Sequence, residues 1–220
     1  MADIPGTILS AAAITWHMAD AGGDSDVDLM SRAAAGDRDA FAALYRRHQA
    51  TIYRFARLMT GSSQMAEDVV QDVFLALMRH ASRYDAARAS LTSYLYGSAR
   101  HHTRRRLLRD RLFVAVDNRA LDARGLTDGG VVAGELVRAC EVRELRAAIL
   151  TLPARYREVI VLCDLQDVSY AETATAIGCA VGTVRSRLHR ARQLLAQKMR
   201  RSAACTKVAA ASSGAYLLDS

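Results

Sequence analysis

One short segment of the sequence gathers side chains that bind nucleic acid. Arg185, Arg187, Arg190 and Arg192 follow one another within the segment Ser169–Arg192, and no acidic residue interrupts them. A planar guanidinium donates two parallel hydrogen bonds to a guanine edge or to a phosphate. On a helix, such a run predicts contact with the major groove of duplex DNA.

The same segment has the features of a helix-turn-helix. Ser169 and Glu172 have the spacing of a capping box, which starts a helix. Gly178 can adopt the left-handed conformation of a tight turn, and the small Ala174 lets two helices approach closely. On a second helix beginning near Val181, one apolar stripe should face the core; it consists of Val184, Leu188, Ala191 and Leu195.

The remaining positions of that second helix form the predicted reading surface. We expect four side chains to reach base edges of duplex DNA: Arg185, Ser186, His189 and Arg190. Arg187 and Arg192 are better placed for phosphate contacts. A solvated basic face on an ordinary helix is the alternative. The capping box, the glycine turn and the lack of acids together favour DNA binding.

A second basic stretch, RHHTRRRLLRDR (Arg100–Arg111), contains six arginines and a single acid, Asp110. It follows Tyr84, Tyr94 and Tyr96 in the sequence. Cations that follow a backbone, combined with aromatic faces on which bases stack, are typical of surfaces that bind single-stranded nucleic acid. For Tyr94 and Tyr96, a place in the hydrophobic core is an equally good interpretation.

A third stretch, AEDVVQDVFLALMR (Ala66–Arg79), is acidic on one side. Asp68, Gln71 and Asp72 lie at i, i+3 and i+4, so a helix places them on one face. This face could dock a basic partner. A paired-carboxylate catalytic or metal site is one alternative, although no histidine accompanies it, and a plain solvated face is the other.

Composition narrows the class of protein. The 220 residues carry a formal net charge of +7, which favours a polyanionic partner. Two prolines and 6% aromatic residues, among many alanines, leucines and arginines, predict an all-α chain. No apolar run approaches the roughly 20 residues that span a membrane, and Ile8–Met18 lacks the basic flank of a signal peptide. We therefore expect a cytoplasmic protein that does not insert into membranes.

The four cysteines give no sign of a metal or redox centre. No two of them form a C-x-x-C pair, and no His/Cys cluster has zinc spacing. We expect free thiols in a reducing cytoplasm, and neither a metal nor another cofactor. The cysteines are Cys140, Cys163, Cys179 and Cys205.

Helical periodicity appears in two blocks. We expect two helical domains, residues 27–111 and 135–201, because apolar residues recur there at helical spacing. Residues 112–134 are rich in glycine and aspartate, which predicts a flexible linker. We expect residues 1–26 to form a disordered extension and residues 202–220 a flexible tail.

These pieces, in this order, resemble a bacterial RNA polymerase sigma factor of the extracytoplasmic-function (ECF) group. Ala34–Tyr45 resembles the first helix of that group's region two. Ala66–Arg79 is very similar to the helix that docks on the coiled coil of the polymerase clamp. Leu152–Leu162 and Val181–Arg192 are close to the signatures of region four. The resemblance covers nearly the whole chain from Asp28 to Arg201.

The resemblance implies a role for each surface. Asp68, Gln71 and Asp72 would contact core polymerase. The loop 84–92 would capture a flipped base of the minus-ten element, and the helix after it would hold the non-template strand. The implied minus-ten residues are Tyr84, Tyr94, Arg100, His101, Arg104 and Arg105. The implied minus-thirty-five residues are Arg185, Ser186, Arg187, His189 and Arg190.

The resemblance also implies a non-catalytic subunit that directs promoter-specific initiation and helps to melt the promoter. Its partners would be core polymerase, promoter DNA and an anti-sigma factor, with no small-molecule substrate. The chain departs from the family at Tyr94, usually Trp, at His101 and Arg105, often Asn and Asp, and at Asp167, usually Gly. A stand-alone helix-turn-helix regulator that binds a palindrome as a dimer is the closest alternative. A metal-dependent enzyme built on Glu67, Asp68 and Asp72 is more remote.

Overall fold

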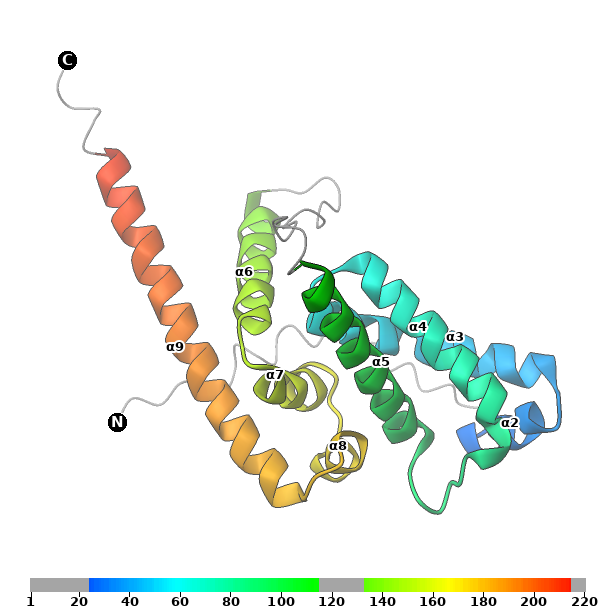
Figure 1. Ribbon diagram of the computed structural model, residues 1–220. Coiled ribbons are helices and arrows are strands. Elements are labelled where there is room, and N and C mark those ends of the chain that lie inside the picture. The colour runs from blue at the N-terminus through cyan, green and yellow to red at the C-terminus, as the bar shows by residue number, and fades with distance from the viewer. Residues whose placement is uncertain (1–23, 115–132, 215–220) are drawn as a thin grey trace.

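The computed structural model describes residues 24–114 and 133–214, and every regular element in these ranges is helical. This confirms the predicted all-α fold. Figure 1 shows α2–α5 on one side of the molecule and α6–α9 on the other. The bounds are α2 Asp26–Ala34, α3 Arg38–Thr60, α4 Ser63–His80, η1 Ala81–Arg83, α5 Leu91–Val114, α6 Ala133–Leu150, α7 Ala154–Ile160, η2 Val161–Leu165, α8 Tyr170–Ile177 and α9 Val181–Gly214.

Side-chain caps set the helix boundaries of the N-terminal group. The Asp37 carboxylate accepts hydrogen bonds from two backbone amides at the start of α3, and the Ser62 hydroxyl accepts one at the start of α4. Between them, Gly61 ends α3 at φ +78°, a conformation that favours glycine. This turn reverses the chain, so α3 and α4 pack along each other. Ser90 caps α5 by accepting a hydrogen bond from the Ser93 amide.

The helix-turn-helix has the predicted caps and turn. The Ser169 hydroxyl accepts from the Glu172 amide at 3.2 Å, and Gly178 ends α8 at φ +69°. Asp167 has φ 52°, so it occupies the left-handed region at a position where the family usually has glycine. Short polar side chains tolerate this region better than bulky ones. The predicted core stripe of α9 is buried at all four positions, from Val184 to Leu195.

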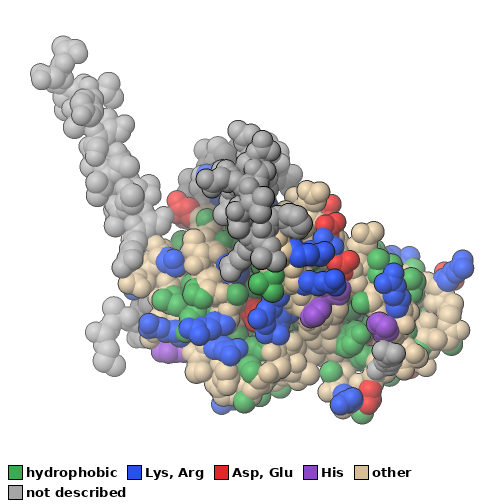
Figure 2. Space-filling model, in the orientation of Figure 1, with side chains coloured by type: hydrophobic (Ala, Val, Ile, Leu, Met, Phe, Trp, Pro, Cys, Tyr) green, Lys and Arg blue, Asp and Glu red, His purple; other side chains and the backbone are tan. Residues whose placement is uncertain are grey.

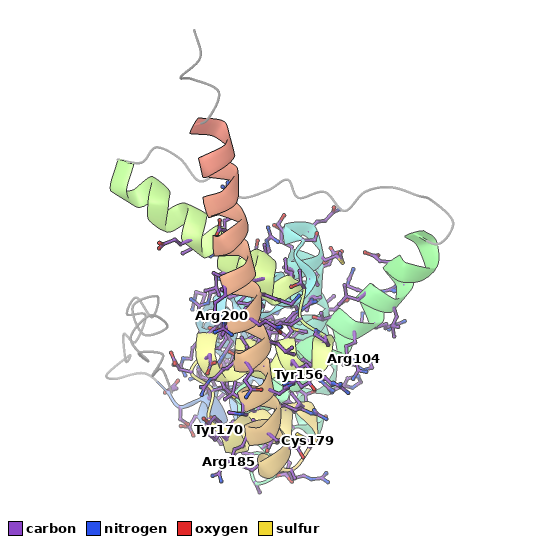
Figure 3. All side chains as sticks on the ribbon, turned by 90° about the vertical axis from the view of Figure 1, so that its left-hand side faces the viewer. Arg104, Tyr156, Tyr170, Cys179, Arg185 and Arg200 are labelled. Carbon is purple, nitrogen blue, oxygen red and sulfur yellow. The ribbon has the colours of Figure 1, made fainter. Side chains whose placement is uncertain are left out.

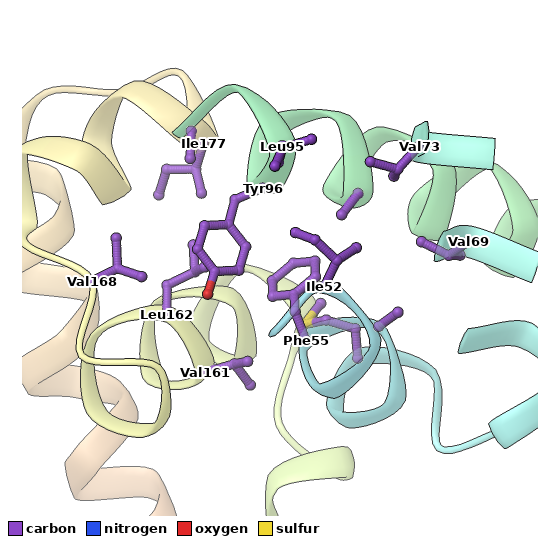
Figure 4. Packing of buried hydrophobic residues seen from close by; sticks show 14 of the residues in the cluster. Ile52, Phe55, Val69, Val73, Leu95, Tyr96, Val161, Leu162, Val168 and Ile177 are labelled. Carbon is purple, nitrogen blue, oxygen red and sulfur yellow. The ribbon is translucent and has the colours of Figure 1, made fainter. Parts of the chain in front are cut away.

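Both groups of helices contribute to one hydrophobic core. The Tyr96 ring is 1% exposed and lies 5.5 Å, centroid to centroid, from Phe55. Figure 4 shows it between Phe55 of α3 and three residues of the C-terminal group: Leu162, Val168 and Ile177. Tyr96 is therefore a core residue, as one of the two interpretations of the sequence allowed. Burial raises the pKa of its phenol, and the hydroxyl donates to Gln166 Oε1 at 3.4 Å.

The contact between α5 and α8 brings the two groups together. Gly97 permits this close approach, since a Cβ atom there would lie 3.3 Å from the Ala176 carbonyl oxygen. The Ser93 hydroxyl donates to the Glu172 carbonyl, and Arg157 donates to the Met59 carbonyl at 2.5 Å. The two helical groups therefore form a joint interface in this arrangement.

The ends of the chain differ in part from expectation. α2 begins at Asp26 and is capped by Ser25, inside the extension 1–26 that we expected to be disordered. α9 continues through Gly214, into the tail 202–220 that we expected to be flexible. Alanine is frequent in this part of α9, and its helix propensity explains the continuation. Residues 1–23, 115–132 and 215–220, which include most of the expected linker, lie outside the described residues.

Candidate polymerase- and DNA-binding surfaces

Helical spacing alone brings the residues of the acidic face of α4 together. Asp68, Gln71 and Asp72 lie on one side of α4, with Gln71 exposed and the two carboxylates partly exposed. The opposite side of α4 carries Val69 and Val73, which are 0% and 1% exposed. Packing of this apolar stripe against α3 and α5 therefore fixes which way the acids point.

An arginine from α5 pairs with both carboxylates. Arg106 Nη1 lies 2.7 Å from Asp68 Oδ2, and Arg106 Nη2 lies 2.6 Å from Asp72 Oδ2. In the part of the chain with described side chains, no group of three His, Cys, Asp or Glu side chains could hold a metal ion. The guanidinium of Arg106 lies against both acids.

An apolar groove beside these acids was not anticipated from the sequence. It lies between α3 and α4, has a volume of about 860 Å³, and has Asp68 and Gln71 on its lining. Three of its large apolar side chains are exposed: Tyr45, Leu75 and Met78. The sequence feature that could have indicated this groove is the presence of apolar residues on α3 and α4 outside the stripe that faces the core.

The tyrosines predicted for the minus-ten site come together. The Tyr84 and Tyr94 rings meet edge to face with centroids 5.7 Å apart, and the Tyr84 hydroxyl donates to the Ala89 carbonyl at 3.1 Å. Tyr94 and His101 line a shallow surface hollow of about 540 Å³. Thr175 of α8 also lines this hollow.

Some arginines of α5 are exposed to solvent, and one contacts an acid of the C-terminal group. Arg104 and Arg105 are exposed, as is His101. Arg100, in contrast, faces the C-terminal group, where its Nε lies 3.0 Å from Glu158 Oε2 without hydrogen-bond alignment. The Glu158 side chain is only 4% exposed. Five of the six predicted minus-ten residues therefore lie along one side of α5 and its preceding loop, and Arg100 pairs with an acid.

The predicted reading surface of α9 is exposed at its base-reading positions. Arg185, Ser186, His189 and Arg190 are all exposed, and Arg187 is half-buried. The Arg185 guanidinium lies 6.0 Å from the centre of the Tyr170 ring, at the limit of a cation–π contact. Figure 3 shows this pair at the lower end of α9, with Arg104 on α5 to one side.

Some side chains of α9 hydrogen-bond to neighbouring side chains or form ion pairs with them. Arg190 Nη1 donates to Gln193 Oε1 at 3.1 Å, and the Gln193 amide lies 2.9 Å from His189 Nε2. Arg192 forms a bidentate pair with Asp164, at 2.6 and 3.0 Å, and so is already engaged within the protein. On the face seen in Figure 2, basic side chains extend from α9 across to α5.

None of the helices among the described residues is both long and apolar enough to cross a membrane. Two of the cysteines have described side chains, Cys163 and Cys179, and both are free thiols. Burial raises the pKa of Cys163, so this thiol stays protonated at neutral pH.

Comparison with known proteins identifies both helical groups. Residues 44–112 match the family described as Sigma-70 region 2, and residues 142–195 match Sigma-70, region 4. The ECF RNA polymerase sigma factor SigM of Mycobacterium tuberculosis is 36% identical over 175 residues, which cover 79% of this chain and 84% of SigM. The ECF RNA polymerase sigma factor SigW of Bacillus subtilis is 30% identical over 172 residues, covering 75% of this chain and 91% of SigW.

A solved structure extends the likeness to the fold. CnrH, determined in complex with the cytosolic domain of CnrY, superimposes with a TM-score of 0.61 at 25% identity, covering 81% of this chain and 99% of CnrH. The order of helices, the two matched regions and the relatives agree with one another. The chain therefore belongs to the ECF RNA polymerase sigma factors, the subunits that direct the polymerase to specific promoters.

Proposed function

We propose that this sigma factor uses three separate surfaces in initiation. The acidic face of α4, with Asp68, Gln71 and Asp72, docks on the clamp coiled coil of core polymerase. The loop 84–92 and α5 hold the melted minus-ten strand, and α9 reads the minus-thirty-five element as duplex. The observation that carries this proposal is that α4 presents partly exposed acids, whereas α5 and α9 present exposed basic side chains.

The minus-ten surface combines aromatic and cationic groups. Tyr94 and His101 lie on the side of α5 that an unstacked base would meet once α8 has moved away, while Arg104 and Arg105 are exposed and suited to the backbone. Stacking and other contacts with the base offset the few kcal/mol needed to unstack it. His101 and Arg105, where the family often has Asn and Asp, alter the minus-ten sequence that this surface prefers.

The minus-thirty-five surface combines base and phosphate contacts. Arg185 and Arg190 are suited to guanine edges, and Ser186 and His189 can donate or accept. Arg187 is suited to phosphate. Binding by the chain alone is weak and steeply dependent on salt, because phosphate neutralisation supplies much of the affinity.

Promoter binding requires α8 to move away from α5. Ser93 is 2% exposed in the present arrangement, and Arg100 is paired with Glu158, so part of the strand-holding side of α5 is covered. We infer that core polymerase and promoter DNA together separate the two helical groups. In the open form, Arg100 becomes free to meet a phosphate.

The chain itself makes and breaks no bonds in this scheme, and it works in the cytoplasm with polymerase on the nucleoid. By the family resemblance, it is held inactive by an anti-sigma factor. A related fold, the sigma factor RpoE of Bartonella quintana, was crystallised with its anti-sigma factor NepR. A palindrome-binding regulator would not need the acidic face of α4.

Replacing both docking acids by amides tests the polymerase contact. Asp68→Asn together with Asp72→Asn should weaken core binding by about 10- to 100-fold, because a basic partner loses two charge-assisted hydrogen bonds. The measurement is a fluorescence titration of the labelled full chain with core polymerase. Asp110→Asn, an exposed acid of α5, is the control and should leave affinity unchanged. Unchanged affinity in the double variant would refute docking by α4.

A further inference from the structure

Arg106 differs from Arg104 and Arg105, its neighbours in the basic stretch, in the contacts that its side chain makes. Its side chain leaves α5 toward α4, where it makes three contacts shorter than 3.2 Å with two carboxylates: Nη1 to Asp68 Oδ2, Nη2 to Asp72 Oδ2, and Nε to Asp72 Oδ2. Arg104 and Arg105, two residues and one residue earlier, are exposed instead. Arg106 thus connects the strand-holding helix to the docking helix.

The Arg106 side chain is more buried than the two acids that it contacts. The Arg106 side chain is 22% exposed, whereas those of Asp68 and Asp72 are 44% and 31% exposed. Each carboxylate meets Arg106 through Oδ2, and Oδ1 takes no part in these contacts. A carboxylate accepts several hydrogen bonds, so an incoming cation can bind Oδ1 while Arg106 keeps Oδ2.

Arg106 is the permanent cation at this cluster. His102, the other basic side chain in contact, lies 3.5 Å from Asp72 Oδ2. Burial lowers the pKa of His102, and the neighbouring His101, Arg105 and Arg106 lower it further, against the opposing effect of Asp72. His102 is therefore neutral at neutral pH.

Two carboxylates at i and i+4 on a helix repel each other, and each side chain is free to change rotamer. A guanidinium fork between them removes the repulsion and fixes both rotamers before the partner arrives. Preorganisation of this kind lowers the entropy lost on binding.

We propose that Arg106 is a positioning residue for polymerase docking: from α5, it holds the carboxylates of Asp68 and Asp72 in place with Oδ1 of each left for a cation of the polymerase. This proposal rests on the docking surface proposed above. It assigns Arg106 to the polymerase side of the module, although the sequence places it among residues of the DNA side.

Titration of the labelled full chain with core polymerase, without DNA, tests the proposal. Arg106→Gln should weaken core binding by about 5- to 20-fold, a coupling typical of side chains in one ion-pair network. Arg109→Gln is the matched control, since it removes the same charge from an exposed site one turn further along α5. It should leave the affinity for core unchanged.

A variant cycle separates positioning from a general loss of structure. If Arg106 acts through the two acids, adding Arg106→Gln to Asp68→Asn and Asp72→Asn should produce no further loss of affinity. A variant that merely loosened the fold would lose affinity again. Thermal unfolding of each variant measures that effect directly.

Each outcome decides one of the two proposals. The positioning role alone is overturned if Arg106→Gln binds core as well as or more tightly than the unchanged chain, while the double Asn variant still loses affinity. Tighter binding would mean that Arg106 competes with the polymerase for the two acids. An additive loss in the triple variant also overturns it. If the double Asn variant binds core normally, the docking surface itself is wrong.

Discussion

At the scale of single residues, charge alone does not tell what an arginine does. Arg100, Arg104 and Arg106 belong to one basic stretch, yet one pairs with Glu158, one is exposed and one holds two aspartates. The partner of each arginine depends on its position around α5 and on which helix packs against that side of α5. Arg192 likewise pairs with Asp164, which the sequence pattern did not indicate.

Arg190 offers a test of base reading. Arg190→Ala should weaken binding at one position of the minus-thirty-five element by about 1–3 kcal/mol, because a bidentate contact discriminates one base pair. Binding of the holoenzyme to promoters with single substitutions measures this. Arg146→Ala, an exposed arginine on α6, serves as the control. An equal loss on every sequence would show that Arg190 contacts phosphate instead.

At the scale of elements, α8 and α9 could be predicted because their signals are local. Ser169, Glu172 and Gly178 lie within a few residues of the boundaries they set. The buried stripe from Val184 to Leu195 follows from helical periodicity. The caps, the turn and the buried stripe of the helix-turn-helix could therefore be predicted from the sequence.

The surroundings of α5 could not be predicted in the same way. α5 contacts α3, α4 and α8, so its buried side chains are distributed around the helix instead of along one stripe. Its small residues Ser93 and Gly97 face α8, and Glu158 lies far from Arg100 in sequence. Contacts between distant elements leave no periodic signal, which is why Arg106 and Glu158 were missed.

The packing of α8 on α5 predicts a change of distance on promoter binding. Dyes on Gln64→Cys of α4 and Gln197→Cys of α9, with the native cysteines replaced by alanine, report on the two helical groups. Energy transfer should fall when core polymerase and promoter DNA are added, because α8 must leave α5. Dyes on Gln64→Cys and Arg46→Cys, both in the N-terminal group, are the control. Constant transfer between the groups in the promoter complex would contradict opening.

At the scale of the whole molecule, three surfaces with different chemistry are held by one helical framework. In the proposed scheme, the acids of α4 bind a basic protein partner, Tyr94 and the exposed arginines of α5 bind an unstacked strand, and the arginines of α9 bind duplex DNA. Buried residues of both groups form one core around Tyr96. This division of labour fits a subunit that places polymerase on DNA.

Transcription with purified components tests this role most directly. Core polymerase, genomic DNA fragments and the full chain are combined, and the transcript starts are mapped. We predict that starts appear at discrete sites that share a minus-ten and a minus-thirty-five element, and only when the chain is present. Starts that are the same with and without the chain, or that are only suppressed by it, would contradict its role as a promoter-specificity subunit.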